Sequence, residues 1–159
     1  MAVDMFLKID GIKGESQDGK HKEEIDVLAW SWGMAQSGTS HMGSGGGSGK
    51  VSVQDLSITK YIDKASPPLS SHCCSGKHIP KASLIVRKAG DKPVEYVKIE
   101  MEDLIVTHVS VGGSGGEDRL TENVTLNFAK FKYVYTTQAK DGSAGPEVEA
   151  TWNIAKGEK

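Results

Sequence analysis

The chain has 159 residues, and its 19 basic and 21 acidic side chains give a net charge of −2. This length suits one domain, 1–159, whose hydrophobic core is large enough to fold without disulfides. The charges are spread along the chain and form no basic stripe, which excludes nucleic acid and anionic membranes as favoured partners. No apolar run approaches the roughly 20 residues needed to cross a bilayer, so we expect no membrane insertion.

The N-terminal stretch does not resemble a signal peptide. Asp4, Lys8 and Asp10 interrupt it before an apolar h-region could form. The two cysteines, Cys73 and Cys74, are adjacent in sequence and make no disulfide framework, which fits a reducing compartment. We therefore expect folding in the cytoplasm and, if the protein is exported, a route that needs no signal peptide.

Alternating apolar and polar residues predict strands along most of the chain. The expected strands cover 3–9, 24–36, 51–60, 81–89, 94–101, 104–111, 122–136 and 148–154. The apolar parity changes within 51–60, which indicates a bulge or a strand buried on both faces, and within 122–136, which indicates a bulge.

One short helix is predicted between these strands. Ser66 can cap it, Pro67 suits its first position, and Gly76 suits the position just past its end. Many short strands with one helix favour a mainly β barrel or sandwich.

The segment 24–36 has two contrasting faces. Trp30 and Trp32 fall on a bulky face, whereas Ala29, Ser31 and Gly33 fall on a small one. We expect the tryptophans to pack into the wall of the fold and the small residues to point away from it.

The segment 37–50 is rich in glycine and serine and resembles a flexible linker. Strand patterns flank it on both sides, and a loop this long inside a compact domain usually has a partner to lie against. Gly49 and Lys50 suggest a phosphate-binding loop, but Ser44 and Val51 stand where that motif requires Gly and Ser or Thr. We reject nucleotide binding and predict no cofactor.

His72, Cys73, Cys74 and His78 form the one cluster of thiols and imidazoles. Adjacent cysteines diverge by about 100° on a helix, which disfavours a zinc site. Small core thiols beside solvated histidines are the preferred interpretation, and a Cys–His nucleophile is the alternative. The sequence therefore predicts no catalytic or metal-binding residue, and it leaves the role of the two cysteines open.

Several segments resemble the Hcp family (haemolysin-coregulated protein) of the type VI secretion system. The matching segments are 1–6, 8–9, 23–33, 49–51, 54–56, 59–64, 87–90 and 112–128. The strongest match is 112–128, which reads Gly-Gly-Ser-Gly-Gly-Glu-Asp-Arg-Leu-Thr-Glu-Asn-Val-Thr-Leu-Asn-Phe. Together these segments span nearly the whole chain in order.

The resemblance implies a compact antiparallel β-barrel with one short helix, which forms homohexameric rings and has no enzymatic activity. Such rings stack into a tube inside a contractile sheath, are capped by a spike protein and carry small effector proteins. Sheath contraction then exports the tube from the bacterial cytoplasm to the outside. The alternatives are a monomeric ligand-binding β-barrel and a Cys–His hydrolase.

Two hypotheses about surfaces follow from this resemblance. Ala29, Ser31 and Gly33 are expected to face the lumen and its cargo, unless that face packs under another element. The loop 37–50 is expected to lie against the neighbouring subunit or the next ring. The loop residues expected at that contact are Thr39, His41, Met42 and Lys50.

Overall fold

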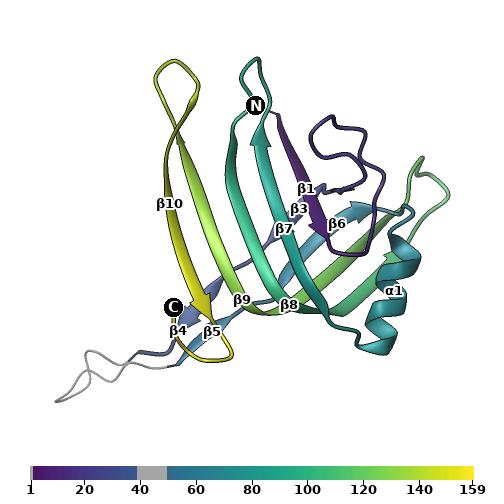
Figure 1. Ribbon diagram of the computed structural model, residues 1–159. Coiled ribbons are helices and arrows are strands. Elements are labelled where there is room, and N and C mark those ends of the chain that lie inside the picture. The colour runs from purple at the N-terminus through teal and green to yellow at the C-terminus, as the bar shows by residue number, and fades with distance from the viewer. Residues whose placement is uncertain (1, 39–49) are drawn as a thin grey trace.

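The computed structural model describes residues 2–38 and 50–159 (Figure 1). The strands are β1 (Val3–Ile9), β2 (Ile25–Asp26), β3 (Ala29–Ser31), β4 (Met34–Gln36), β5 (Val51–Val53), β6 (Leu56–Tyr61), β7 (Ile79–Lys88), β8 (Glu95–Gly112), β9 (Thr121–Gln138) and β10 (Ala144–Asn153). The described residues contain one helix, α1 (Ser66–Ser75). The fold is therefore mainly β with one short helix, as the sequence predicts.

The main sheet is antiparallel and closes into a barrel. Its order is β2-β1-β7-β8-β9-β6-β3, so its two edge strands both belong to the short stretch 25–31. In the chain between β2 and β3, the Val27 N–H donates to the Met5 carbonyl at 3.0 Å, and the Leu28 N–H donates to the Thr59 carbonyl at 2.8 Å. One stretch of chain thus bonds first to β1 and then to β6, which joins the two sides of the sheet.

The single strand predicted over 24–36 is wrong because this segment changes partner twice. It pairs with β1 as β2, with β6 as β3 and with β5 as β4. The parity change in 51–60 has the same origin. Here β5 pairs with β4, and after Gln54 and Asp55 the chain continues as β6 between β3 and β9.

The two strands predicted over 94–101 and 104–111 form one 18-residue strand, β8. The buried residues change parity between Met101 and Leu104, and Asp103 has a φ of +55°. In β9 the buried residues change parity between Phe128 and Phe131, as predicted, but the bulge predicted there is wrong because β9 stays in register with both β8 and β10 at these residues. The pairing of β8 with β9 stays in register across this level. Both strands therefore turn a corner together.

The second edge of β9 is shared by two strands. β6 pairs with 121–126 and β10 with the C-terminal half of β9, so β10 extends the sheet beyond the closed barrel. β4 and β5 form a separate two-stranded ribbon. In Figure 1 the β9–β10 hairpin rises on the left, away from α1.

The helix ends as the sequence predicts but begins differently. Gly76 has a φ of +67°, which favours glycine, and its N–H donates to the His72 carbonyl at 2.9 Å. Ser66 is the first helical residue and not the cap, a position taken by Ala65. The Ser66 hydroxyl is instead used in a buried polar cluster.

That cluster is centred on Lys60, which is fully buried. The Lys60 ammonium pairs with Glu122 and donates to Asp63 at 2.8 Å and to the Ser66 hydroxyl at 3.1 Å. The Ser66 hydroxyl donates to Glu122 Oε1 at 2.6 Å. These bonds connect β6 and β9 to the start of α1 and hold the helix on the barrel.

A second polar cluster holds the loop between β1 and β2. The Arg87 guanidinium donates to Asp18 at 2.6 and 3.0 Å and to Asp4 at 3.1 Å. His21 is buried, with its Nε2 2.6 Å from Glu95 Oε1. Hydrogen bonds from Arg87 hold the pKa of the Asp18 carboxyl well below its usual range.

Removing the Lys60 charge should destabilise the fold strongly. Lys60→Met leaves the buried Glu122 carboxylate without its cation, and we expect a loss of about 3 to 5 kcal/mol in the free energy of unfolding. The double variant Lys60→Met/Glu122→Leu should recover most of that loss. Urea unfolding measures the free energy of unfolding of both variants. The surface variant Lys98→Met is the control, and its free energy of unfolding should lie within about 0.5 kcal/mol of the wild-type value. If Lys60→Met alone is as stable as wild type, Lys60 does not stabilise the fold by neutralising Glu122.

Asp18 should contribute to acid sensitivity. A carboxyl whose pKa is lowered by folding stabilises the protein above its unfolded pKa, and that stabilisation is lost as pH falls. Asp18→Asn should therefore lose less stability than wild type between pH 6 and pH 3, measured from urea midpoints. Asp91→Asn, in the exposed β7–β8 turn, controls for loss of one carboxylate. Equal losses in wild type and Asp18→Asn would refute this role.

Candidate functional site: a polar wall across four strands

The closing strands carry a continuous polar surface on the side opposite the core. Directly paired residues of neighbouring strands point to the same face. The register places two rows across β3, β6, β9 and β8, the first Ser31–Ser57–Thr125–His108 and the second Ala29–Thr59–Asn123–Ser110. We call these eight residues the polar wall. The residues between them, such as Ile58 and Val124, are buried in the core.

Hydrogen bonds between side chains fix the middle of the polar wall. The Ser57 and Thr125 hydroxyls lie 3.4 Å apart, and the Thr59 hydroxyl donates to Asn123 Oδ1 at 2.8 Å. These side chains are held by each other, so the polar wall is ordered without a ligand. Its side chains are small except for the imidazole of His108, which ends the first row.

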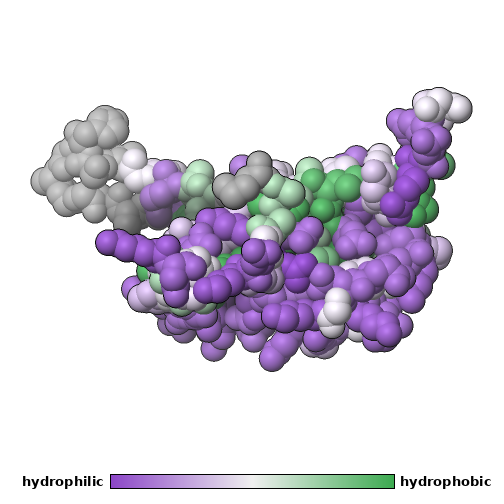
Figure 2. Space-filling model, turned by 90° about the horizontal axis from the view of Figure 1, so that it is seen from above, coloured by the Kyte–Doolittle hydropathy of each residue, from purple (hydrophilic) through white to green (hydrophobic). Residues whose placement is uncertain are grey.

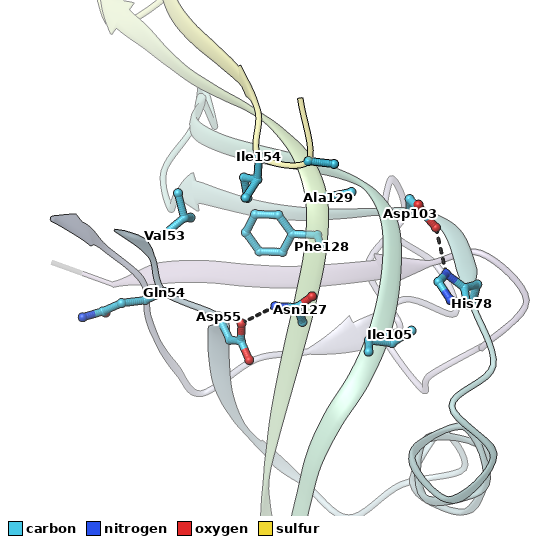
Figure 3. Close-up of a pocket in the computed structure, with 11 residues that line it drawn as sticks. Val53, Gln54, Asp55, His78, Asp103, Ile105, Asn127, Phe128, Ala129 and Ile154 are labelled. Carbon is cyan, nitrogen blue, oxygen red and sulfur yellow. Dashed lines mark hydrogen bonds and ion pairs between the residues drawn. The ribbon is translucent and has the colours of Figure 1, made fainter. Parts of the chain in front are cut away.

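A shallow cavity of about 290 Å³ adjoins the polar wall where β6 begins and β10 ends. Asp55 fixes this corner because its carboxylate accepts from Asn127 Nδ2 at 2.8 Å (Figure 3) and from the Thr107 hydroxyl at 3.1 Å. On the far side of the cavity, His78 Nδ1 lies 2.9 Å from Asp103. Both ion-pairing side chains are mostly exposed, so the pair stabilises the fold little.

The thiol–imidazole cluster does not form a reactive site in the described chain. His72 Nδ1 lies 2.8 Å from the Pro68 carbonyl, and neither cysteine forms a hydrogen bond with a described histidine. Cys73 packs against the core and Cys74 is exposed, both as free thiols. The described residues contain no group of three His, Cys, Asp or Glu side chains placed to hold a metal.

The predicted surface residues divide into two groups. Ala29 and Ser31 are exposed on the polar wall, and the tryptophans Trp30 and Trp32 pack against the core as predicted. Gly33 lies beyond the end of β3 and is half-buried, with Gln54 covering it. It therefore does not extend the polar wall.

Sequence reasoning missed the polar wall outside β3. A signal was present, because the uncharged polar residues Asn123, Thr125 and Asn127 alternate with apolar ones. Only the register shows that this alternation continues the face of Ser31. Thr39, His41 and Met42 lie outside the described residues. Lys50 is described, is exposed and lines a cleft beside β10.

No helix in the part of the chain that the structure describes is long and apolar enough to span a bilayer.

Comparisons with known proteins agree with one another. The model of the family described as "Type VI secretion system effector, Hcp" matches residues 6–135. Protein hcp1 of Pseudomonas aeruginosa is 62% identical over 156 residues, which cover 97% of this chain and 96% of that protein.

Solved structures give the same result. The crystal structure of Hcp1 from Salmonella typhimurium matches with a TM-score of 0.80 and 44% identity, covering 100% of this chain and 99% of that one. A type VI secretion effector from Yersinia pestis matches with a TM-score of 0.78 and 40% identity, covering 95% and 100%. A further structure, described as a type six secretion system protein, has a TM-score of 0.93 at 28% identity and covers 99% of both chains. The chain therefore belongs to the Hcp family, the non-enzymatic, secreted tube proteins of the type VI secretion system.

Proposed function

We propose that this chain assembles into homohexameric rings whose channel is lined by the polar wall. The observation that carries the proposal is the polar wall itself, which places Ala29 and Ser31 in two ordered rows of small polar side chains. The rings stack into the tube, with the sheath around them and the spike at one end. Small effector proteins are the cargo of the channel.

The chemistry of the polar wall suits transient retention of cargo. The hydroxyl and amide groups in its middle already bond to each other, Ser57 to Thr125 and Thr59 to Asn123, so a cargo surface gains few strong new bonds there. None of its side chains is larger than His108, which leaves the channel wide. A cargo protein is then held by many weak contacts and can leave after delivery.

Membership of a family of secreted proteins supports a proposal for the localisation. The subunit folds in the bacterial cytoplasm and leaves the cell with the tube, without a signal peptide, because sheath contraction supplies the export. The loop residues Thr39, His41, Met42 and Lys50 are proposed to contact a neighbouring subunit or the next ring.

A monomeric ligand-binding barrel is the weaker candidate. In lipocalin-like barrels the ligand occupies the interior. Here the interior is filled by buried side chains, among them Leu7, Ile25, Leu84, Ile99 and Leu126. The two clefts described here among residues 50–159 and 34–36 open to the surface and not into this interior.

Enlarging Ser31 should separate cargo retention from ring assembly. Ser31→Gln adds a bulky side chain to the polar wall, so we expect the ring to form but to retain at least 10-fold less cargo. Light scattering with size-exclusion chromatography reports the ring at 6 × 17.0 = 102 kDa. Mass spectrometry of small proteins that co-purify from the source bacterium reports cargo, with Ser75→Gln on the exposed end of α1 as control.

The possible outcomes of this experiment are distinct. A 17.0 kDa wild-type species at high concentration overturns the assembly. Loss of the ring only in Ser31→Gln places Ser31 in a packed contact instead of the channel. Unchanged cargo in an intact Ser31→Gln ring shows that the polar wall does not hold it.

A further inference from the structure

Segment 13–24 belongs to the connection between β1 and β2 and contains no apolar side chain. In Figure 1 this connection folds back beside β1 after that strand ends. Such a segment suits a hydrophilic surface, and one side of the molecule is almost entirely hydrophilic when it is seen from above (Figure 2). Because the segment has no apolar side chain to bury, polar contacts have to hold it on the barrel.

The segment is folded on itself. The Gly14 N–H donates to the Glu23 carbonyl at 2.8 Å, and the Ser16 N–H donates to the Glu24 carbonyl at 2.9 Å. A Cβ at Gly14 would lie 2.5 Å from the Glu24 carbonyl oxygen, so the two arms of the segment touch. Glu23 has a φ of +63°, which is unfavourable for a residue with a side chain. The docked fold therefore carries backbone strain that its contacts with the barrel offset.

His21 makes contacts that join this segment to the barrel. Its side chain is 6% exposed, and its ring stacks on the Phe6 ring of β1 with the centroids 4.4 Å apart. The His21 Nδ1 lies 2.9 Å from Glu24 Oε2, and the Nε2 lies 2.6 Å from Glu95 Oε1 in β8. One buried imidazole thus connects the segment to two strands of the barrel.

These contacts require the charged form of His21. An ionised carboxylate only accepts hydrogen bonds, and a neutral imidazole has one N–H, so it would turn a lone pair toward Glu24 or Glu95. An imidazolium donates to both. Glu24 is the more demanding partner, because its side chain is 12% exposed and its Oε1 is buried without a hydrogen bond among the described residues. A buried carboxylate that loses its cation is costly.

The other cations around His21 are engaged elsewhere. Arg87 is bound by the two aspartates of its own cluster, and the Lys98 ammonium lies 3.3 Å from Glu100. His21 is therefore the cation that holds Glu24. The charged groups that surround His21 are Asp18 and Glu24 of the segment, Asp4 of β1, Asp26 of β2, Arg87 of β7, and Glu95 and Lys98 of β8.

We propose that His21 is a proton-dependent latch, whose charged form docks segment 13–24 on β1 and β8 and whose deprotonation releases it. Histidine side chains change their charge between about pH 5 and pH 8. As pH rises and His21 loses its proton, one of its two bonds is lost, and the strained segment detaches. The barrel stays closed because segment 13–24 contributes none of its strands. Release uncovers the Phe6 ring, which is 4% exposed in the docked state.

The latch lies within one subunit, so this inference does not rest on the proposed ring. It concerns the alkaline side alone, because at acid pH several carboxylates around His21 take up protons together. A segment with few apolar contacts opens at a low free energy, and a single buried charge can therefore control it.

Amide hydrogen exchange of the full-length protein, read by mass spectrometry, measures the release. Between pH 6 and pH 9, the protection of peptides from 13–24, corrected for the intrinsic exchange rate, should fall by about 10-fold or more, as expected for one charged hydrogen bond. Peptides of β7 and β8 should keep their protection. Exchange at the imidazole Cε1 position titrates His21 separately from the other histidines and should give the same midpoint.

Three variants isolate the charge of His21. Glu95→Gln removes one carboxylate, so the midpoint of release should move down by about one pH unit. Glu100→Gln is the matched control on the same strand, because Glu100 is 39% exposed and Glu95 is 38% exposed, and it should keep the wild-type midpoint. His21→Phe preserves an aromatic ring beside Phe6 without a charge, so the protection of 13–24 should no longer depend on pH between 6 and 9.

The latch is overturned by any of three results. Constant protection of 13–24 between pH 6 and pH 9 in wild type shows that the charge of His21 does not hold the segment. Equal midpoints for Glu95→Gln and Glu100→Gln remove the Glu95 contact from the mechanism. Protection that still depends on pH in His21→Phe assigns the effect to another group. Thermal unfolding checks that the variants fold, and if His21→Phe does not, wild type and the two glutamine variants decide the question.

Discussion

The closure of the barrel by residues 25–31 is the constraint on which the rest of the structure depends. This short stretch bonds to β1 on one side and to β6 on the other, so it fixes the distance between strands far apart in sequence. Trp30 and Trp32 then face the core, and Ser31 faces outward. The closure therefore sets both the packing of the core and the orientation of the polar wall.

The corner shared by β8 and β9 gives the molecule two regions with different chemistry. One edge of β9 pairs with β8 along most of its length. In the N-terminal half of β9, the other edge pairs with β6, and the outward face of the sheet is the polar wall. In the C-terminal half of β9, this second edge pairs with β10, and the core face of the sheet stays exposed at Tyr135 and Val148. Near Asp103 in β8 and Ala129 in β9, the buried side chains switch from odd-numbered to even-numbered positions or the reverse. Because the switch occurs at paired residues, the two strands stay in register while the sheet changes direction.

The buried charges stabilise the architecture. Lys60 and Glu122 tie the helix to the barrel, and Arg87 ties the first long loop to β1 and β7. Such pairs are costly to break and specify how segments dock. A rigid subunit with complementary outer surfaces is what a tube requires, because its function arises between copies.

Local features of the sequence determined the helix end at Gly76, the strand 3–9, the inward tryptophans and the mainly β class, because glycine conformation and two-residue periodicity act over a few residues. The segments that resemble the Hcp family also led to the correct family from sequence. Only the tertiary structure decided that 24–36 is three strands, that 94–111 is one, and that Ser66 binds Glu122 instead of capping the helix. It also decided that Ser31, Ser57, Thr125 and His108 share a row. Strand partners and register depend on contacts between residues distant in sequence, which periodicity along one segment does not encode.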